Sequence, residues 1–154
     1  MEGLSHQYSE DPVEWALVGL LHDIDYEVTK DHPERHGLEG AEILARGGYS
    51  EGLVSALRSH NQATGYIPKN RMEKALYAVD PVSGFIVACA LIHPDRCLEC
   101  LDLPFLLNRF KEKGFARGAN REQIRSCEAI GMNLDDFLMS ALSAMQKISS
   151  QLGL

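Results

Sequence analysis

Basic residues are in the minority in this sequence. It has 15 lysines and arginines against 22 aspartates and glutamates, which gives a formal net charge of −7. A chain with this deficit has no general electrostatic attraction for nucleic acid or for anionic membranes. Long hydrophobic runs are also missing, because the longest, Phe85 to Ile92, is far too short to span a bilayer, and no signal sequence precedes it. We therefore expect a cytoplasmic protein with no nucleic-acid partner and no membrane partner.

Cysteine is scarce as well, with four residues, at positions 89, 97, 100 and 127. In a chain without an export signal, we expect these cysteines to be reduced thiols. Cys97 and Cys100 form a single C-x-x-C pair. A structural zinc site needs a second pair of ligands at matching spacing, and the sequence shows no second pair of this kind. We therefore expect no zinc site at these cysteines.

No strand, repeat or linker is evident, whereas helical patterns fill the chain. Asp11 followed by Pro12 is typical of a helix start, and Glu14 is placed to reach back to the cap. Asn70 and Glu73 have the spacing of a capping box. The apolar periodicity predicts helices over residues 11–22, 36–48, 50–61, 70–92, 103–115, 120–131 and from 133 onward, the fourth interrupted at Asp80-Pro81. The sequence thus predicts one all-α domain of about seven or eight helices over residues 1–154.

Several ionisable residues fall beside apolar positions at the ends of these predicted helices. His22 and Asp23 end the first helix, His36 opens the second, His60 ends the third, and Asp80 lies inside the fourth. Burying such groups is costly unless they are paired or bound to a cation. Neutral imidazoles and carboxylates are suitable metal ligands, and adjacent residues can converge on one ion where a helix ends. The pattern favours a metal site.

Four segments, "LLHDID", "HGLEGAEIL", "SHN" and "ALYAVDPVSG", resemble successive motifs of the HD-domain metal-dependent phosphohydrolases. The later segment "NRFKEKGFARGANREQI" resembles a subfamily known as HDIG-type predicted hydrolases. The resemblance implies an all-helical fold and a site with one or two divalent transition metals, namely iron, manganese, nickel or zinc. Carried over motif by motif, it implies these metal ligands: His22, Asp23, His36, His60 and Asp80.

The family also has a first-ligand histidine on a helix upstream of the His-Asp pair, and this chain has no good match for it. His6 precedes His22 but lies just before the Asp11 cap. His32 is a poorer match than His36, because "GLEGAEIL" fixes the register on His36. One hypothesis is that the first helix lacks its N-terminal part, and another is that His6 substitutes for the missing ligand.

Two further groups of residues bear on catalysis and on the substrate. Asp25 or Glu27 could act as a general base or as a partner that orients a ligand histidine, and a solvated loop is the alternative. Residues 109–125 carry six basic residues against two glutamates. Lys111, Arg117 and Arg121 could bind the phosphate of a substrate, and a solvated helix face is equally compatible with the pattern.

These features lead to a hypothesis about function. We expect a phosphohydrolase that cleaves a small, nucleotide-like phosphoester with a metal-bound hydroxide, with Asp23 and Asp25 as catalytic residues. A homodimer is an open possibility. One alternative is a di-iron oxygenase with the same ligands, as in the inositol-oxygenase branch of the superfamily. Another is a degenerate HD module that binds a nucleotide or a partner without turnover.

Overall fold

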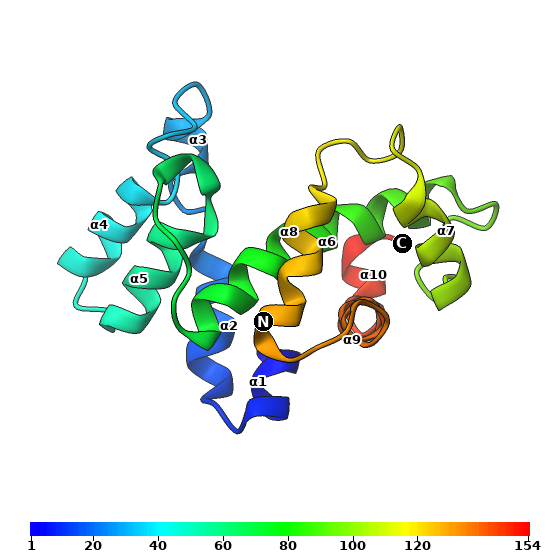
Figure 1. The fold of residues 1–154 in the computed structure, drawn as a ribbon, viewed down its shortest axis with the longest axis horizontal. Coiled ribbons are helices and arrows are strands. Elements are labelled where there is room, and N and C mark those ends of the chain that lie inside the picture. Colours follow the sequence, from blue (N-terminus) through cyan, green and yellow to red (C-terminus); the bar gives the residue numbers. More distant parts are fainter. The chain divides into compact units, whose positions relative to one another are not determined.

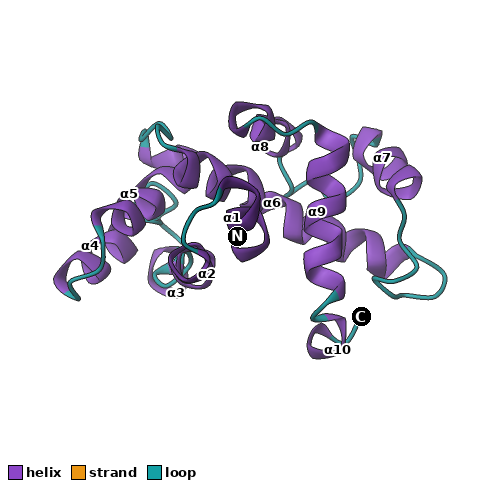
Figure 2. Ribbon diagram, turned by 90° about the horizontal axis from the view of Figure 1, so that it is seen from below, coloured by secondary structure: helices purple, strands orange, loops and turns teal.

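A computed structural model describes all 154 residues and contains helices but no strand, as Figures 1 and 2 show. The α-helices are α1 (Glu2–Tyr8), α2 (Pro12–Leu21), α3 (Tyr26–Thr29), α4 (Leu38–Arg46), α5 (Glu51–His60), α6 (Arg71–Ile92), α7 (Leu103–Lys111), α8 (Arg121–Arg125), α9 (Leu134–Gln146) and α10 (Ser149–Leu152). Two 3-10 helices, η1 (Gln62–Thr64) and η2 (Ser126–Ile130), complete the set. The all-α prediction is confirmed, and the short α-helices α1 and α3 are those that the apolar periodicity did not indicate.

The chain forms two compact units, residues 1–77 and residues 78–154. The first unit contains α1 to α5 and the start of α6, and the second contains the rest of α6 and α7 to α10. In the first unit α5 packs against both α4 and α2, and α1 packs against α2. Its buried side chains include Trp15, Leu44, Leu53 and Leu57. In the second unit α9 packs against α7 and η2.

Helix boundaries follow the predicted caps in most places. The side chain of Asp11 accepts a hydrogen bond from the N–H of Val13 at 2.9 Å, and Ser50 caps α5 through the N–H of Leu53. Asn133 caps α9 in the same way. Glu14 differs from its predicted role, because its carboxylate accepts a hydrogen bond from the Ser50 hydroxyl.

The predicted interruption at Asp80-Pro81 is wrong, because α6 continues through Pro81. Proline costs a helix one internal hydrogen bond, and buried apolar residues on both sides of Pro81 offset that cost. They include Leu76, Val82, Phe85 and Ile86.

By length and composition alone, α6 could also cross a membrane, with a mean hydropathy of 1.9 in its most apolar window. However, 44% of that window is buried inside the protein. A core helix has the same composition, so this is weak evidence for a membrane span.

Glu73 connects the start of α6 to α5. Its carboxylate accepts hydrogen bonds from the Ser55 hydroxyl, from the backbone N–H groups of Lys69 and Asn70, and from the Asn70 side chain. The N–H of Glu73 donates in return to the side chain of Asn70 at 2.9 Å, so the predicted capping box is present. Burial raises the pKa of Glu73, but the hydrogen bonds from Ser55, Lys69 and Asn70 together outweigh it and leave the pKa below its ordinary value.

We expect Glu73→Ala to lower the free energy of unfolding by about 2 kcal/mol, because several donors lose their acceptor. The pKa of Glu73 is lowered on folding, so its contribution is present above its ordinary pKa and is lost as the pH falls through the folded-state pKa. The difference from wild type in urea unfolding should therefore be largest at neutral pH and shrink as the pH falls below the ordinary pKa of glutamate. Glu42→Ala, which removes an exposed pair with Arg46, is the control and should change little. Equal effects of the two variants would contradict the assignment.

Candidate metal centre

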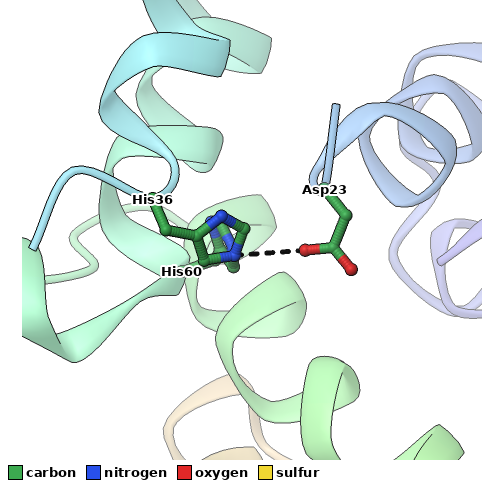
Figure 3. Close-up of side chains that lie close together, drawn as sticks. All are labelled: Asp23, His36 and His60. Atoms are coloured by element: carbon green, nitrogen blue, oxygen red, sulfur yellow. Dashed lines mark hydrogen bonds and ion pairs between the residues drawn. The ribbon is translucent and has the colours of Figure 1, made fainter. Parts of the chain in front are cut away.

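Three segments of the first unit bring Asp23, His36 and His60 to one point. Asp23 lies in the turn after α2, His36 directly precedes the N-cap residue of α4, and His60 is the last residue of α5. Figure 3 shows the Asp23 carboxylate pointing towards the imidazoles of His36 and His60. These residues, distant in sequence, meet because α5 packs against both α2 and α4.

The distances within this cluster are short. The His36 Nε2 atom lies 3.2 Å from Asp23 Oδ1 and 3.1 Å from His60 Nε2. One ligand atom from each of the three residues lies within 4.8 Å of the others. His22 adjoins the cluster, with its Nε2 atom 3.3 Å from Asp23 Oδ2. The structure thus brings together four of the five residues predicted as metal ligands.

The hydrogen bonds of the imidazoles determine which ring nitrogen carries the proton. His22 Nδ1 lies 2.9 Å from the carbonyl oxygen of Gly19, and His60 Nδ1 lies 2.7 Å from that of Leu57. A carbonyl oxygen only accepts, so both Nδ1 atoms donate, and in the neutral rings both Nε2 atoms are unprotonated. His36 Nδ1 lies 2.9 Å from the carboxylate of Asp25 and donates to it. All three rings therefore present an Nε2 lone pair on the side of Asp23.

Asp25 is buried behind the cluster with 1% of its surface exposed. Besides His36, its carboxylate accepts hydrogen bonds from the N–H groups of Gly37 and Gly40, each at 2.8 Å. This placement suits a residue that orients a ligand histidine, one of the two roles suggested by the sequence. A general base must reach a substrate or water, and this buried carboxylate does not. Glu27, the other acid, is exposed and pairs with Lys30 at 3.7 Å.

Glycine is required where α4 begins. Gly37 has φ 88°, and a Cβ atom there would lie 2.5 Å from the carbonyl oxygen of Leu57 and 2.9 Å from the His60 ring. Any side chain would therefore displace the end of α5 from the start of α4. Gly37, the first glycine of "HGLEG", allows the close approach that places His36 beside His60.

The donor set fits a divalent transition metal. The unprotonated Nε2 atoms of His36 and His60 and an oxygen of Asp23 converge, and such an arrangement is favourable only with a cation or a proton between the atoms. The hydrogen bond with Asp23 raises the pKa of His36 against the opposing effect of burial, and the same bond lowers the pKa of Asp23. A proton on His36 thus competes with a metal for the same place.

The cluster is open on one side. The Asp23 side chain is 52% exposed and the His36 side chain 16%, whereas His60 is buried. Solvent or a substrate can reach the ligands from the side of Asp23. His6, the suggested substitute for an upstream ligand, is exposed and is not part of the cluster.

The remaining predicted site residues belong to the second unit. Asp80 is half-buried in α6 and lines a cavity of about 430 Å³ together with small residues such as Gly84, Ala116 and Gly118. Its role as a metal ligand stays a prediction. Lys111 and Arg117 are exposed, and their role in substrate binding also stays a prediction.

Arg121 has contacts that disagree with its predicted role as a phosphate clamp. Its guanidinium donates to four backbone carbonyl oxygens, at distances of 2.6 to 3.2 Å, those of Phe110, Phe115, Ala116 and Ala119. It also stacks on the ring of Phe85, 4.6 Å from the centroid. Four of its five N–H groups are occupied, so Arg121 holds the loop before α8 and keeps one N–H group for any other acceptor.

The cysteines also depart from expectation. Cys97 and Cys100 form a disulfide, and only Cys89 and Cys127 are free, both buried. Burial raises the pKa of Cys89 to about 12 and that of Cys127 to about 11. The expectation of four reduced thiols is wrong for one pair in this structure.

The chain is all-helical and carries, at its helix ends, a cluster of histidines and an aspartate that could hold a metal ion. Comparison with known families is more specific, because residues 1–84 match the model of the HD domain. The chain therefore belongs to the HD domain family. No curated protein and no solved structure shows a significant similarity to the chain. The family match covers α1 to the middle of α6, so the prediction of one HD domain over residues 1–154 stays a prediction.

We expect Asp25→Asn to weaken metal binding about 10- to 100-fold, because an amide supports the imidazole of His36 less well than a carboxylate does. Titration calorimetry with Mn²⁺, which prefers nitrogen and oxygen ligands to thiolates, measures the change. Glu27→Gln removes an exposed carboxylate two residues away and should leave the affinity unchanged. Equal affinities of the wild type and Asp25→Asn would show that Asp25 does not support the site.

For Arg121 we expect a structural role. Arg121→Gln should lower the free energy of unfolding by about 2 kcal/mol, since four partly buried hydrogen bonds lose their charged donor. The exposed Arg117→Gln should stay within about 0.5 kcal/mol of wild type. Urea unfolding followed by circular dichroism compares the two variants, and an unchanged midpoint for Arg121→Gln would contradict the role.

Proposed function

We propose that the chain is a metal-dependent phosphohydrolase that acts on a small, nucleotide-like phosphoester. The observation that supports this most is the convergence of the Nε2 atoms of His22, His36 and His60 on the Asp23 carboxylate, with an acceptor beside each Nδ1 atom, within a chain of the HD domain family. Asp23, His36 and His60 would hold a divalent transition metal, with His22 beside them. When bound, such a metal polarises phosphoryl oxygens and makes a water molecule more acidic.

The surrounding residues prepare this site. Asp25 and the carbonyl oxygens of Gly19 and Leu57 hold the protons on Nδ1, which keeps the Nε2 lone pairs directed at one place. The half-exposed Asp23 leaves a side through which an anionic substrate can approach. We assign Asp25 to positioning rather than to proton transfer, because both of its carboxylate oxygens are engaged.

Exposed basic residues and the net charge of the chain bear on the substrate class. Lys111 and Arg117 remain available for a phosphate, since both are exposed. Because the chain has a net charge of −7, we propose that its partner is a small phosphorylated molecule rather than nucleic acid or a membrane surface. We propose the cytoplasm as its compartment. The number of metals, one or two, and the identity among iron, manganese, nickel and zinc are left to measurement.

The test compares metal content and phosphatase activity on a panel of phosphomonoesters and phosphodiesters. We expect His36→Ala and Asp23→Ala, purified without chelator, to lose the bound metal and to lower activity by about 100-fold or more. His32→Ala is the matched control, because His32 lies in the same loop and is exposed. It should keep both metal and activity.

Two outcomes would change the proposal. Full metal occupancy in both His36→Ala and Asp23→Ala would contradict the site. Metal bound by the wild type without turnover of any phosphoester would favour the HD module that only binds, and oxygen-dependent turnover with iron would favour the oxygenase.

A further inference from the structure

The loop that follows α6 contains five side chains that can bind a metal within eight residues, the segment "HPDRCLEC". Glu99 accepts a hydrogen bond from the Ser149 hydroxyl. The other four supply an imidazole, a carboxylate and two sulfurs, from His93, Asp95, Cys97 and Cys100. The two cysteines have the C-x-x-C spacing of zinc sites. The second ligand pair, which the cysteine spacing alone did not reveal, is the H-x-D pair that directly precedes them.

The structure brings these side chains together. One ligand atom from each of His93, Asp95 and Cys100 lies within 4.8 Å of the others. His93 Nδ1 lies 3.7 Å from Asp95 Oδ2, and Cys97 is joined to Cys100 by a disulfide. All four groups therefore meet on one side of the loop in the second unit.

Neighbouring contacts hold the loop in this shape. Leu98 and Leu101 are buried, and the side-chain amide of Gln146 donates to the carbonyl oxygen of Leu98 at 3.0 Å. The His93 ring packs edge-on against Phe105, with 5.2 Å between centroids. A ligand set that is held in place before binding loses less entropy when the metal arrives.

We propose that this loop, with Cys97 and Cys100 reduced, binds zinc or a similar divalent metal through His93, Asp95, Cys97 and Cys100. Formation of the disulfide between the two cysteines then releases the metal. Two sulfurs on a tetrahedral zinc lie about 3.8 Å apart, since each Zn–S bond is about 2.3 Å long. The Cα atoms of Cys97 and Cys100 are 5.5 Å apart, so rotation of the side chains is enough to pass between the two states. The site lies wholly in the second unit. It does not rest on the function proposed for the cluster of Asp23, His36 and His60, which we call the HD cluster.

The redox step balances with a peroxide as oxidant. The two thiolates lose two electrons and form one S–S bond, and the metal cation is released. Hydrogen peroxide accepts these two electrons with two protons and is cleaved into two water molecules. Cys89 and Cys127 are buried with raised pKa values, so neither is expected to supply a competing thiolate.

Cobalt(II) is the probe, because a cobalt–thiolate bond gives a charge-transfer absorption band that ligands of the HD cluster cannot produce. We expect the full chain, reduced and freed of metal, to develop this band on titration with Co²⁺. Cys97→Ser or Cys100→Ser should abolish the four-ligand site and strongly reduce the band. His93→Ala and Asp95→Asn should weaken cobalt binding at least about 10-fold. Glu99→Gln, a carboxylate change between the two cysteines, is the matched control and should have no effect.

Oxidation tests the second half of the proposal. Adding hydrogen peroxide to the zinc-loaded wild type should release one zinc per chain, measured with a metal-binding dye, as two thiols are lost in a thiol assay. Absence of a thiolate band in reduced wild type would overturn the site. A band unaffected by His93→Ala and Asp95→Asn would overturn the four-ligand assignment, and zinc retained after disulfide formation would overturn the switch. None of these outcomes depends on whether the HD cluster hydrolyses phosphoesters.

Discussion

The candidate metal centre depends on one electrostatic constraint, which is that each of three imidazoles has its Nδ1 proton held by an acceptor behind it. The acceptors are two main-chain carbonyls, of Gly19 and Leu57, and the buried carboxylate of Asp25. Each of these hydrogen bonds leaves the Nε2 lone pair of the ring on the side opposite to the acceptor, and the three Nε2 atoms together face the Asp23 carboxylate. Two of the acceptors belong to helix backbones, so the protonation of the ligands follows from the helices themselves.

Asp25 connects this electrostatic arrangement to the packing of the first unit. Its carboxylate holds His36 and the first turn of α4 at the same time, through the N–H groups of Gly37 and Gly40. The two glycines allow α4 to approach the end of α5 and the turn that carries Asp25, where a Cβ atom would meet Leu57, His60 or Ile24. Asp25, Gly37 and Gly40 therefore determine both the position of the ligand histidines and the packing of α4. A change that loosens α4 also moves a ligand.

Much of this could be predicted from the sequence, because the information is local. Helix caps, helix ends and the histidines beside them follow from short patterns, and the HD motifs place His22, Asp23, His36 and His60 in order. The predictions that failed depend on side-chain contacts that short sequence patterns do not show. Nothing local shows that Arg121 donates to the carbonyls of the preceding loop, or that Pro81 is kept inside a helix by burial of its neighbours. The prediction of reduced thiols rests on the expected compartment, which carries no information on the distance between Cys97 and Cys100, and the structure joins these two in a disulfide.

The two proposed metal sites differ in what they need from the fold. The HD cluster takes its ligands from three segments, so it exists only when α2, α4 and α5 are packed, and metal bound there stabilises the folded first unit. The loop after α6 supplies all its ligands from eight residues, so it needs the second unit only to fix its shape, through buried Leu98 and Leu101 and through contacts with Phe105 and Gln146. Nitrogen and oxygen ligands in the first site remain metal-binding under oxidising conditions, whereas the paired sulfurs of the second do not. A change in redox state would therefore act on the loop and leave the HD cluster with its ligands intact.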